Sequence, residues 1–77
     1  MERIKLIWEF RGPNSRQIAA HHVKHLNEFI ISEDLRNAFC TTEQLTDRYH
    51  LALMVVEKKH MEDLKERLKP HRGQRYP

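Results

Sequence analysis

Three histidines between residues 21 and 25 are the part of this sequence with the clearest potential for chemistry. His21 and His25 are four positions apart, which places their rings one turn apart on the same face of a helix. Such a pair can offer two imidazoles to a metal ion, but a structural zinc site needs four ligands and a catalytic site at least three. The simpler interpretation places both rings in solvent, and metal binding by the pair is the alternative. Candidates for further ligands are Glu28, Cys40, His50 and His60.

A second candidate for reactive chemistry is Cys40, the only cysteine in the 77-residue chain. A catalytic thiol needs a lowered pKa and a positioned base, whereas a free cysteine in mid-strand usually packs as a small apolar residue. The carboxylates lack the spacing of an acid–base pair, and two glycines are too few for a glycine-rich phosphate loop. We therefore expect no cofactor, and an enzyme is the less favoured class of protein.

Positive charge is concentrated near the C-terminus. Residues 58–77 contain seven Lys/Arg and three Asp/Glu, a net charge of +4, whereas residues 1–57 contain seven and eight, a net charge of −1. Such a segment can face phosphates, so nucleic acid is one partner to consider. Against it, acids of the same helix dilute the charge, and the predicted sheet lacks paired stacking aromatics. The candidate phosphate contacts are Lys58, Lys59, Lys65, Arg67, Lys69, Arg72 and Arg75.

Three segments have the pattern of β-strands. Residues 4–10 alternate between apolar and mainly charged side chains, which predicts a first strand with one buried face. Residues 36–43 predict a short and more polar second strand. Residues 49–56 are apolar at both odd and even positions, which is typical of a strand in the middle of a sheet. The second and third strands are close enough in sequence to form a hairpin around residues 45–48.

Two further segments have helical spacing. A helix-start signal at residues 13–15 precedes apolar residues that recur every three or four positions up to Ile30. We expect this helix to end near residues 31–33, without a glycine. A second amphipathic helix follows over residues 61–68, and Pro70 terminates it.

These elements predict an α+β fold of βαββα order, a two-layer sandwich. A helix between the first two strands gives a right-handed crossover, and the hairpin makes the third strand antiparallel. Because the third strand is apolar on both faces, it takes the middle of a three-stranded sheet of order 2-3-1, with both helices on one face. Over residues 3–69 this layout resembles a ferredoxin-like domain that lacks its fourth strand. The resemblance is one of layout and implies no function.

A missing fourth strand would leave two surfaces open. The outer edge of the first strand would be unpaired, and an open apolar edge is a template for pairing with another chain. The sheet face opposite the helices would also be uncovered, and we expect Ile7, Met54 and Val56 there, with Ala52 and Phe39 beside them. The sequence therefore predicts a non-catalytic interaction module that forms a homodimer or binds another protein. Its interface residues would be Ile4, Leu6, Ile7, Trp8, Met54 and Val56.

A nucleic-acid-binding accessory protein that uses the basic C-terminal helix and tail is one alternative to the interaction module, and two others stay open. In the first, the C-terminal tail folds back over one of these surfaces and the protein is a monomer. In the second, a cleft between the stacked sheets of a dimer holds a ligand or an active site that uses Glu9, His50 and Met54. The second rests on analogy between folds alone.

The composition also bounds the class of protein. We expect one α+β domain at residues 1–69 and a flexible basic tail at residues 70–77. A single cysteine argues against a secreted disulfide scaffold, and no stretch approaches the roughly 20 apolar residues of a membrane helix. The first residues lack a signal-peptide pattern. The sequence therefore predicts a cytoplasmic protein without membrane contacts.

Overall fold

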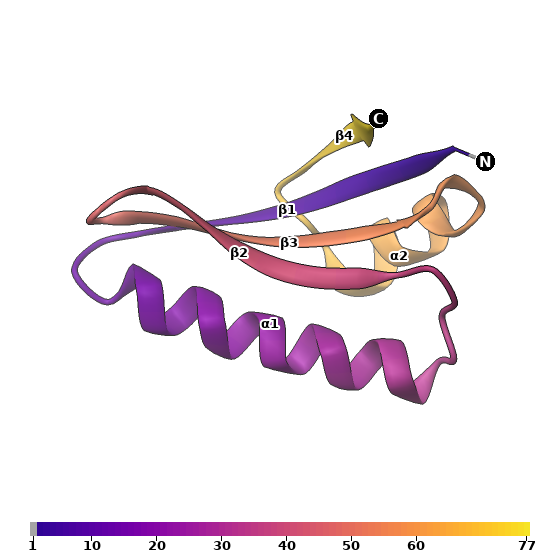
Figure 1. The fold of residues 1–77 in the computed structure, drawn as a ribbon, viewed down its shortest axis with the longest axis horizontal. Coiled ribbons are helices and arrows are strands. Elements are labelled where there is room, and N and C mark those ends of the chain that lie inside the picture. Colours follow the sequence, from indigo (N-terminus) through magenta and orange to yellow (C-terminus); the bar gives the residue numbers. More distant parts are fainter. Residues whose placement is uncertain (1) are drawn as a thin grey trace.

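The computed structural model describes residues 2–77, which form one antiparallel sheet and two α-helices. The sheet order is β2-β3-β1-β4, and both helices lie on one side of the sheet (Figure 1). The protein is therefore an α+β domain. In chain order its elements are β1 (Arg3–Arg11), α1 (Ser15–Ser32), β2 (Phe39–Thr46), β3 (Tyr49–Glu57), the 3-10 turn η1 (Lys58–His60), α2 (Met61–Leu68) and β4 (Arg72–Tyr76).

Most elements lie where the sequence predicts them, and the order β2-β3-β1 with β3 antiparallel is confirmed. β2 begins at Phe39 rather than at residue 36, because Asn37 takes a left-handed φ of 60°, which does not fit a strand. Asp34 takes a left-handed φ of 51°, and the Leu35 N–H then donates to the Ile30 carbonyl at 3.0 Å. Asp34 thus closes the helix in the way that glycine usually does.

The sheet has four strands, so the expectation of three strands with an open first-strand edge is wrong. Residues 72–76, placed by the sequence in a flexible tail, form β4 and pair antiparallel with Arg3–Ile7. At the turn into β4, the His71 N–H donates to the Ile7 carbonyl at 2.9 Å. The Glu9 N–H donates to His71 Nδ1 at 2.8 Å, which satisfies the next donor along the edge of β1. The C-terminal segment therefore folds back over this edge, as the first alternative expected.

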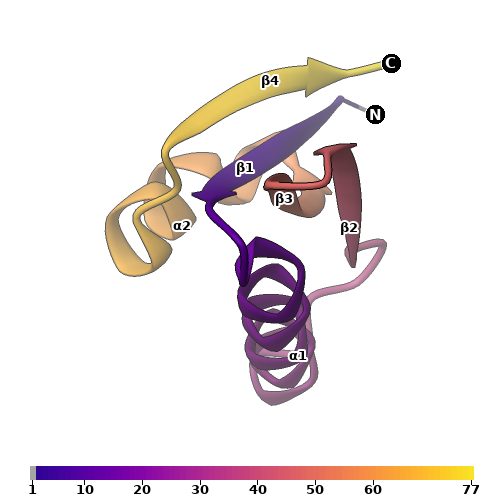
Figure 2. The ribbon, with the colours of Figure 1, turned by 90° about the vertical axis from the view of Figure 1, so that its left-hand side faces the viewer.

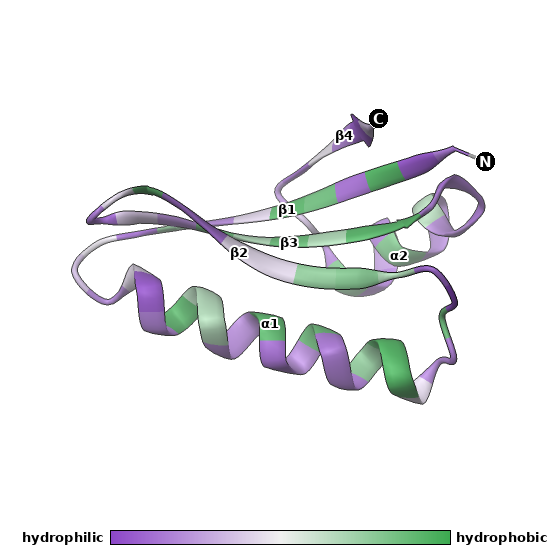
Figure 3. Ribbon diagram, in the orientation of Figure 1, coloured by the Kyte–Doolittle hydropathy of each residue, from purple (hydrophilic) through white to green (hydrophobic). Residues whose placement is uncertain are grey.

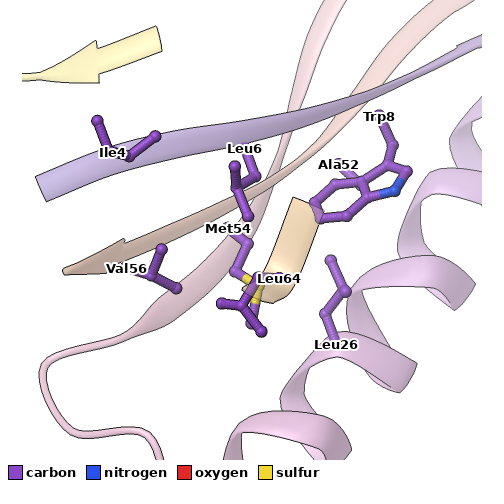
Figure 4. Packing of buried hydrophobic residues seen from close by; sticks show 8 residues of the cluster. All are labelled: Ile4, Leu6, Trp8, Leu26, Ala52, Met54, Val56 and Leu64. Atoms are coloured by element: carbon purple, nitrogen blue, oxygen red, sulfur yellow. The ribbon is translucent and has the colours of Figure 1, made fainter. Parts of the chain in front are cut away.

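The core lies between the sheet and the two helices (Figure 4). β1 and β3 supply most of it, and each helix adds one central leucine, Leu26 from α1 and Leu64 from α2. The Trp8 Nε1–H donates to the Leu68 carbonyl at 3.1 Å, so the last turn of α2 is fixed to the sheet by a buried ring. The central cluster comprises Ile4, Leu6, Trp8, Leu26, Ala52, Met54, Val56 and Leu64.

β3 is apolar along most of its length, whereas β4 is mainly polar (Figure 3). Met54 and Val56 pack against the helices, so their predicted place on the uncovered face is wrong. Ile7 is on that face as predicted, together with Leu51 and Leu53. A strand that is apolar at every position gives no sequence signal for which set of residues faces the helices.

Within residues 2–77, neither α1 nor α2 has the length and apolar character needed to cross a membrane.

Candidate interaction surfaces

The histidine pair on α1 has the geometry that the sequence predicts. His21 and His25 are exposed, their Nε2 atoms are 3.0 Å apart, and Glu28 Oε1 lies 3.4 Å from His25 Nδ1. Among residues 2–77, no three His, Cys, Asp or Glu side chains gather as a metal site would require. The other candidate ligands, Cys40, His50 and His60, form no metal site with the pair in the described residues. Metal binding by His21 and His25 therefore stays a prediction, which zinc titration tests.

His22 lies on the opposite side of α1 and packs against two rings of β1. Its ring centroid is 4.9 Å from that of Trp8 and 5.5 Å from that of Phe10, and its Nε2 is buried without a partner in residues 2–77. Burial lowers the pKa of His22 below its ordinary value of 6.5, and nearby histidines lower it further. His22 is therefore a partly buried residue whose ring is neutral at pH 7.5.

Replacing His22 by phenylalanine is expected to raise the free energy of unfolding at pH 7.5 by about 1 kcal/mol, because the unpartnered buried nitrogen is removed. The pH dependence should change too. Because the unfolded chain binds a proton more readily than folded His22, stability falls as the pH drops below 6.5, and the substitution should flatten this fall. Urea unfolding at pH 7.5 and pH 5.5 measures both effects. A variant less stable than the parent at both pH values would contradict this account.

Three further side chains with reactive potential are buried or partly buried by the fold. The Ser15 hydroxyl lies 2.7 Å from His50 Nδ1, but Ser15 is 0% exposed and His50 only 4%. This pair joins the start of α1 to β3. Cys40 faces the helix side of the sheet, and burial raises the pKa of its thiol to about 12. A thiol in that state is a poor nucleophile at neutral pH.

The residues proposed for a cleft between stacked sheets are not brought together. Glu9 lies on the sheet face away from the helices, whereas His50 and Met54 lie on the helix side. The Tyr49 hydroxyl donates to Glu9 Oε2 at 2.5 Å, and Arg72 Nε lies 3.4 Å from the same oxygen. The hydrogen bond from Tyr49 is the main reason that the pKa of Glu9 is lowered, and the same bond raises the pKa of Tyr49.

On the sheet face away from the helices, the side chains of the strands bury one another. Ile7 is 1% exposed and Leu53 6%, although no helix lies over them. The sheet is strongly twisted, so its two edge strands do not lie flat beside the central pair (Figure 2). Phe39 of β2 and Tyr76 of β4 reach toward each other with ring centroids 6.0 Å apart, and the Arg3 guanidinium lies 5.0 Å from the Tyr76 ring. Ile7, Leu51 and Leu53 pack against one another and against Tyr49, so the bare apolar patch expected from sequence is not present there among residues 2–77.

The predicted interface residues are consequently inside the domain. Ile4, Leu6, Trp8, Met54 and Val56 belong to the helix-side core. The sixth, Ile7, lies beneath the strands' own side chains on the other face. Replacing Ile7 by lysine would disturb folding and would not report on a dimer.

The basic C-terminal residues are spread over η1, α2, β4 and the turn that follows α2. Most of them have an acid nearby: Lys58 and Arg75 lie within 3.9 Å of Glu2, and Arg67 lies 2.9 Å from Glu33. Lys59 pairs with Glu57 at 3.5 Å, and Arg72 pairs with Glu9. Within the described residues, Lys65 and Lys69 have no ion pair. Nucleic-acid binding by this segment stays a prediction, for which a salt-dependent gel shift is the test.

The surface that sequence reasoning missed is the outer edge of β2. Within residues 2–77, β2 ends the sheet and pairs only with β3, so its other edge has unpaired backbone groups. Seven of its eight residues are exposed, including Phe39 at 40% and Leu45 at 45%. The register shift at residues 44–46 is the one irregularity in its ladder with β3. An edge of this kind is suited to pairing with another strand.

Comparison of the chain with known protein families, curated proteins and solved structures found no match.

Proposed function

We propose that the protein is a non-catalytic interaction module that dimerises by pairing the β2 edges of two copies. The observation that carries the proposal is the exposed, unpaired edge of β2, which contains no proline, lysine or glycine that would discourage pairing. The opposite edge strand, β4, is shorter and carries Arg72, Gly73 and Arg75. The two edges of the sheet therefore differ, and β2 is the one that favours association.

The β2 sequence is also complementary to itself. In an antiparallel pair centred on Thr42, each Phe39 comes beside the partner's Leu45, which lies in the bulge at residues 44–46, so the two exposed apolar residues of the strand approach each other. Thr42 lies opposite the partner's Thr42, and Glu43 lies opposite the partner's Thr41. Aromatic–aliphatic and Thr–Thr pairs stabilise neighbouring strands, and this register places no like charges opposite each other.

The order β2-β3-β1-β4, with both crossover connections made by helices, supports a ferredoxin-like assignment for the fold. Pairing two such sheets at β2 would give one continuous eight-stranded sheet with four strands from each copy. The burial of Ser15 and His50 and the raised pKa of the Cys40 thiol support the non-catalytic part of the proposal. The cytoplasmic location expected from sequence belongs to the same proposal.

Two neighbouring lysine substitutions test the register. Thr42→Lys places two positive charges opposite each other, so the dissociation constant of the dimer should rise about fivefold. Thr41→Lys adds the same charge one residue away but places it opposite the partner's Glu43, so the dimer should be as stable as the parent or more stable. Sedimentation equilibrium across a dilution series measures both variants against a monomer mass of 9.4 kDa.

Each result of that experiment has a clear meaning. A parent protein that is monomeric throughout the dilution series overturns the proposal. A dimer that both lysine variants weaken equally, or that neither changes, would be formed through another surface, and the β2 edge would then have no role in it.

A further inference from the structure

A groove lies between α2 and β4. Because β4 and β2 are the two opposite edges of the sheet, this groove is independent of the proposed dimer. Its volume is about 390 Å³, within the usual range for small-molecule sites. Side chains of β1 and α2, with the proline that follows α2, form an apolar floor, and β4 forms one wall. The floor residues are Ile4, Leu6, Met61 and Pro70.

The groove is open because the second residue of β4, Gly73, has no side chain. Gly73 lies opposite Leu6 in the ladder, and a Cβ at Gly73 would stand 3.7 Å from a Leu6 methyl and 3.9 Å from Ile4 Cγ2. Those are ordinary contacts, and the φ of Gly73 is outside the left-handed region, so the backbone does not require glycine. A larger side chain would lie in the groove. A strand glycine of this kind is typical of a place where another group approaches closely.

The rim of the groove is cationic. Lys65 of α2 and Arg75 of β4 stand on its two sides, and no aspartate or glutamate is among its lining residues. Lys65 has no ion pair within residues 2–77, and Arg75 has only a long contact of 3.9 Å with Glu2. Arg72 contributes to the lining too, but its guanidinium is paired with Glu9. An apolar floor with two cations at the rim fits a ligand that has an apolar body and an anionic head.

We propose that this groove binds a single-chain fatty acid in its carboxylate form. The alkyl chain lies along the floor under Gly73, where it removes apolar surface from water. The carboxylate lies between Lys65 and Arg75, where charge-assisted hydrogen bonds hold it. A cationic amphiphile of the same length meets the same floor but is repelled at the rim.

The test is a titration of the ¹⁵N-labelled full chain with decanoate, below its micelle concentration, followed by NMR. Gly73 is one of two glycines in the chain, so its amide signal is simple to assign. Decanoate should shift the signals of Gly73 and Lys65, whereas decyltrimethylammonium should leave both unchanged. Gly73→Leu should abolish binding by filling the groove, and Lys65→Glu should weaken it about tenfold. Lys24→Glu on α1 makes the same charge change away from the groove and should leave binding unchanged.

Equal affinity for decanoate and decyltrimethylammonium would overturn the proposal, because the rim would then not distinguish an anionic head group from a cationic one. Undiminished binding by a folded Gly73→Leu protein would overturn it too, since the ligand would lie elsewhere. If Gly73→Leu fails to fold, the comparison of Lys65→Glu with Lys24→Glu decides, and equal affinities of the two variants would refute the site. None of these results depends on the oligomeric state of the protein.

Discussion

Removal of residues 70–77 is expected to lower the free energy of unfolding by at least about 3 kcal/mol, because the truncation deletes a whole strand's ladder of hydrogen bonds. The chain would lose β4, the bond from Glu9 to His71 and the Tyr76 ring that lies against Phe39. It would also uncover the edge of β1 and the apolar floor beneath Gly73. For a domain of this size, that is a large part of the total stability.

Urea unfolding followed by Trp8 fluorescence measures the effect, because Trp8 is the only tryptophan and is 3% exposed. The matched control is removal of Pro77 alone, which leaves β4 intact and should change stability by less than about 0.5 kcal/mol. A chain truncated after Lys69 that unfolds at the same urea concentration as the parent would show that β4 contributes little, and residues 70–77 would then behave as the flexible tail expected from sequence.

Cys40 is expected to react with a thiol reagent at pH 8 about a thousandfold more slowly than a free cysteine. The thiolate is the reacting form, and a pKa of about 12 in place of the ordinary 9 lowers its population by that factor. Partial burial of the side chain against the helix-side core slows access further. Burial removes water from around the thiolate, and this desolvation raises the pKa of Cys40.

The measurement is the rate of colour release from a disulfide reagent, with the same chain in urea as the reference for an accessible cysteine. Cys40→Ser controls for absorbance changes unrelated to the thiol. Labelling of the folded protein within about tenfold of the unfolded rate would contradict a buried, protonated thiol. It would also reopen Cys40 as a candidate nucleophile.

Sequence patterns predicted the elements that have strong apolar periodicity. Residues 4–10 and the helical spacing up to Ile30 each have one apolar face, and that face is the one the structure buries. β4 has no such pattern, because its residues are polar or glycine on both sides. Its position is set by the unpaired edge of β1, which is a long-range effect that local periodicity does not contain. The one available signal was the layout itself, which lacked a strand beside β1.

The candidate surfaces were harder to predict than the fold. Met54 and Leu53 are both apolar, so the choice of face for β3 depends on which residues of β1 pair with them. The pairing of Leu6 with Met54 and of Ile7 with Leu53 determines it. The β2 edge and the groove depend on strand order and on Gly73, and neither is visible in a pattern of single residues. By contrast, the His21–His25 contact follows from helical spacing alone and was predicted correctly.

The pairing of β1 with β4 also has a consequence for how the domain is made in the cell. Ribosomes synthesise β1 before any other element of this domain and β4 after all the others, although the two strands are neighbours in the sheet. Until the last strand has left the exit tunnel, the nascent chain presents a bare apolar edge from Arg3 to Ile7. During that interval the edge is available to chaperones and to neighbouring nascent chains on the same polysome. Misassembly through this edge therefore stays possible until β4 emerges.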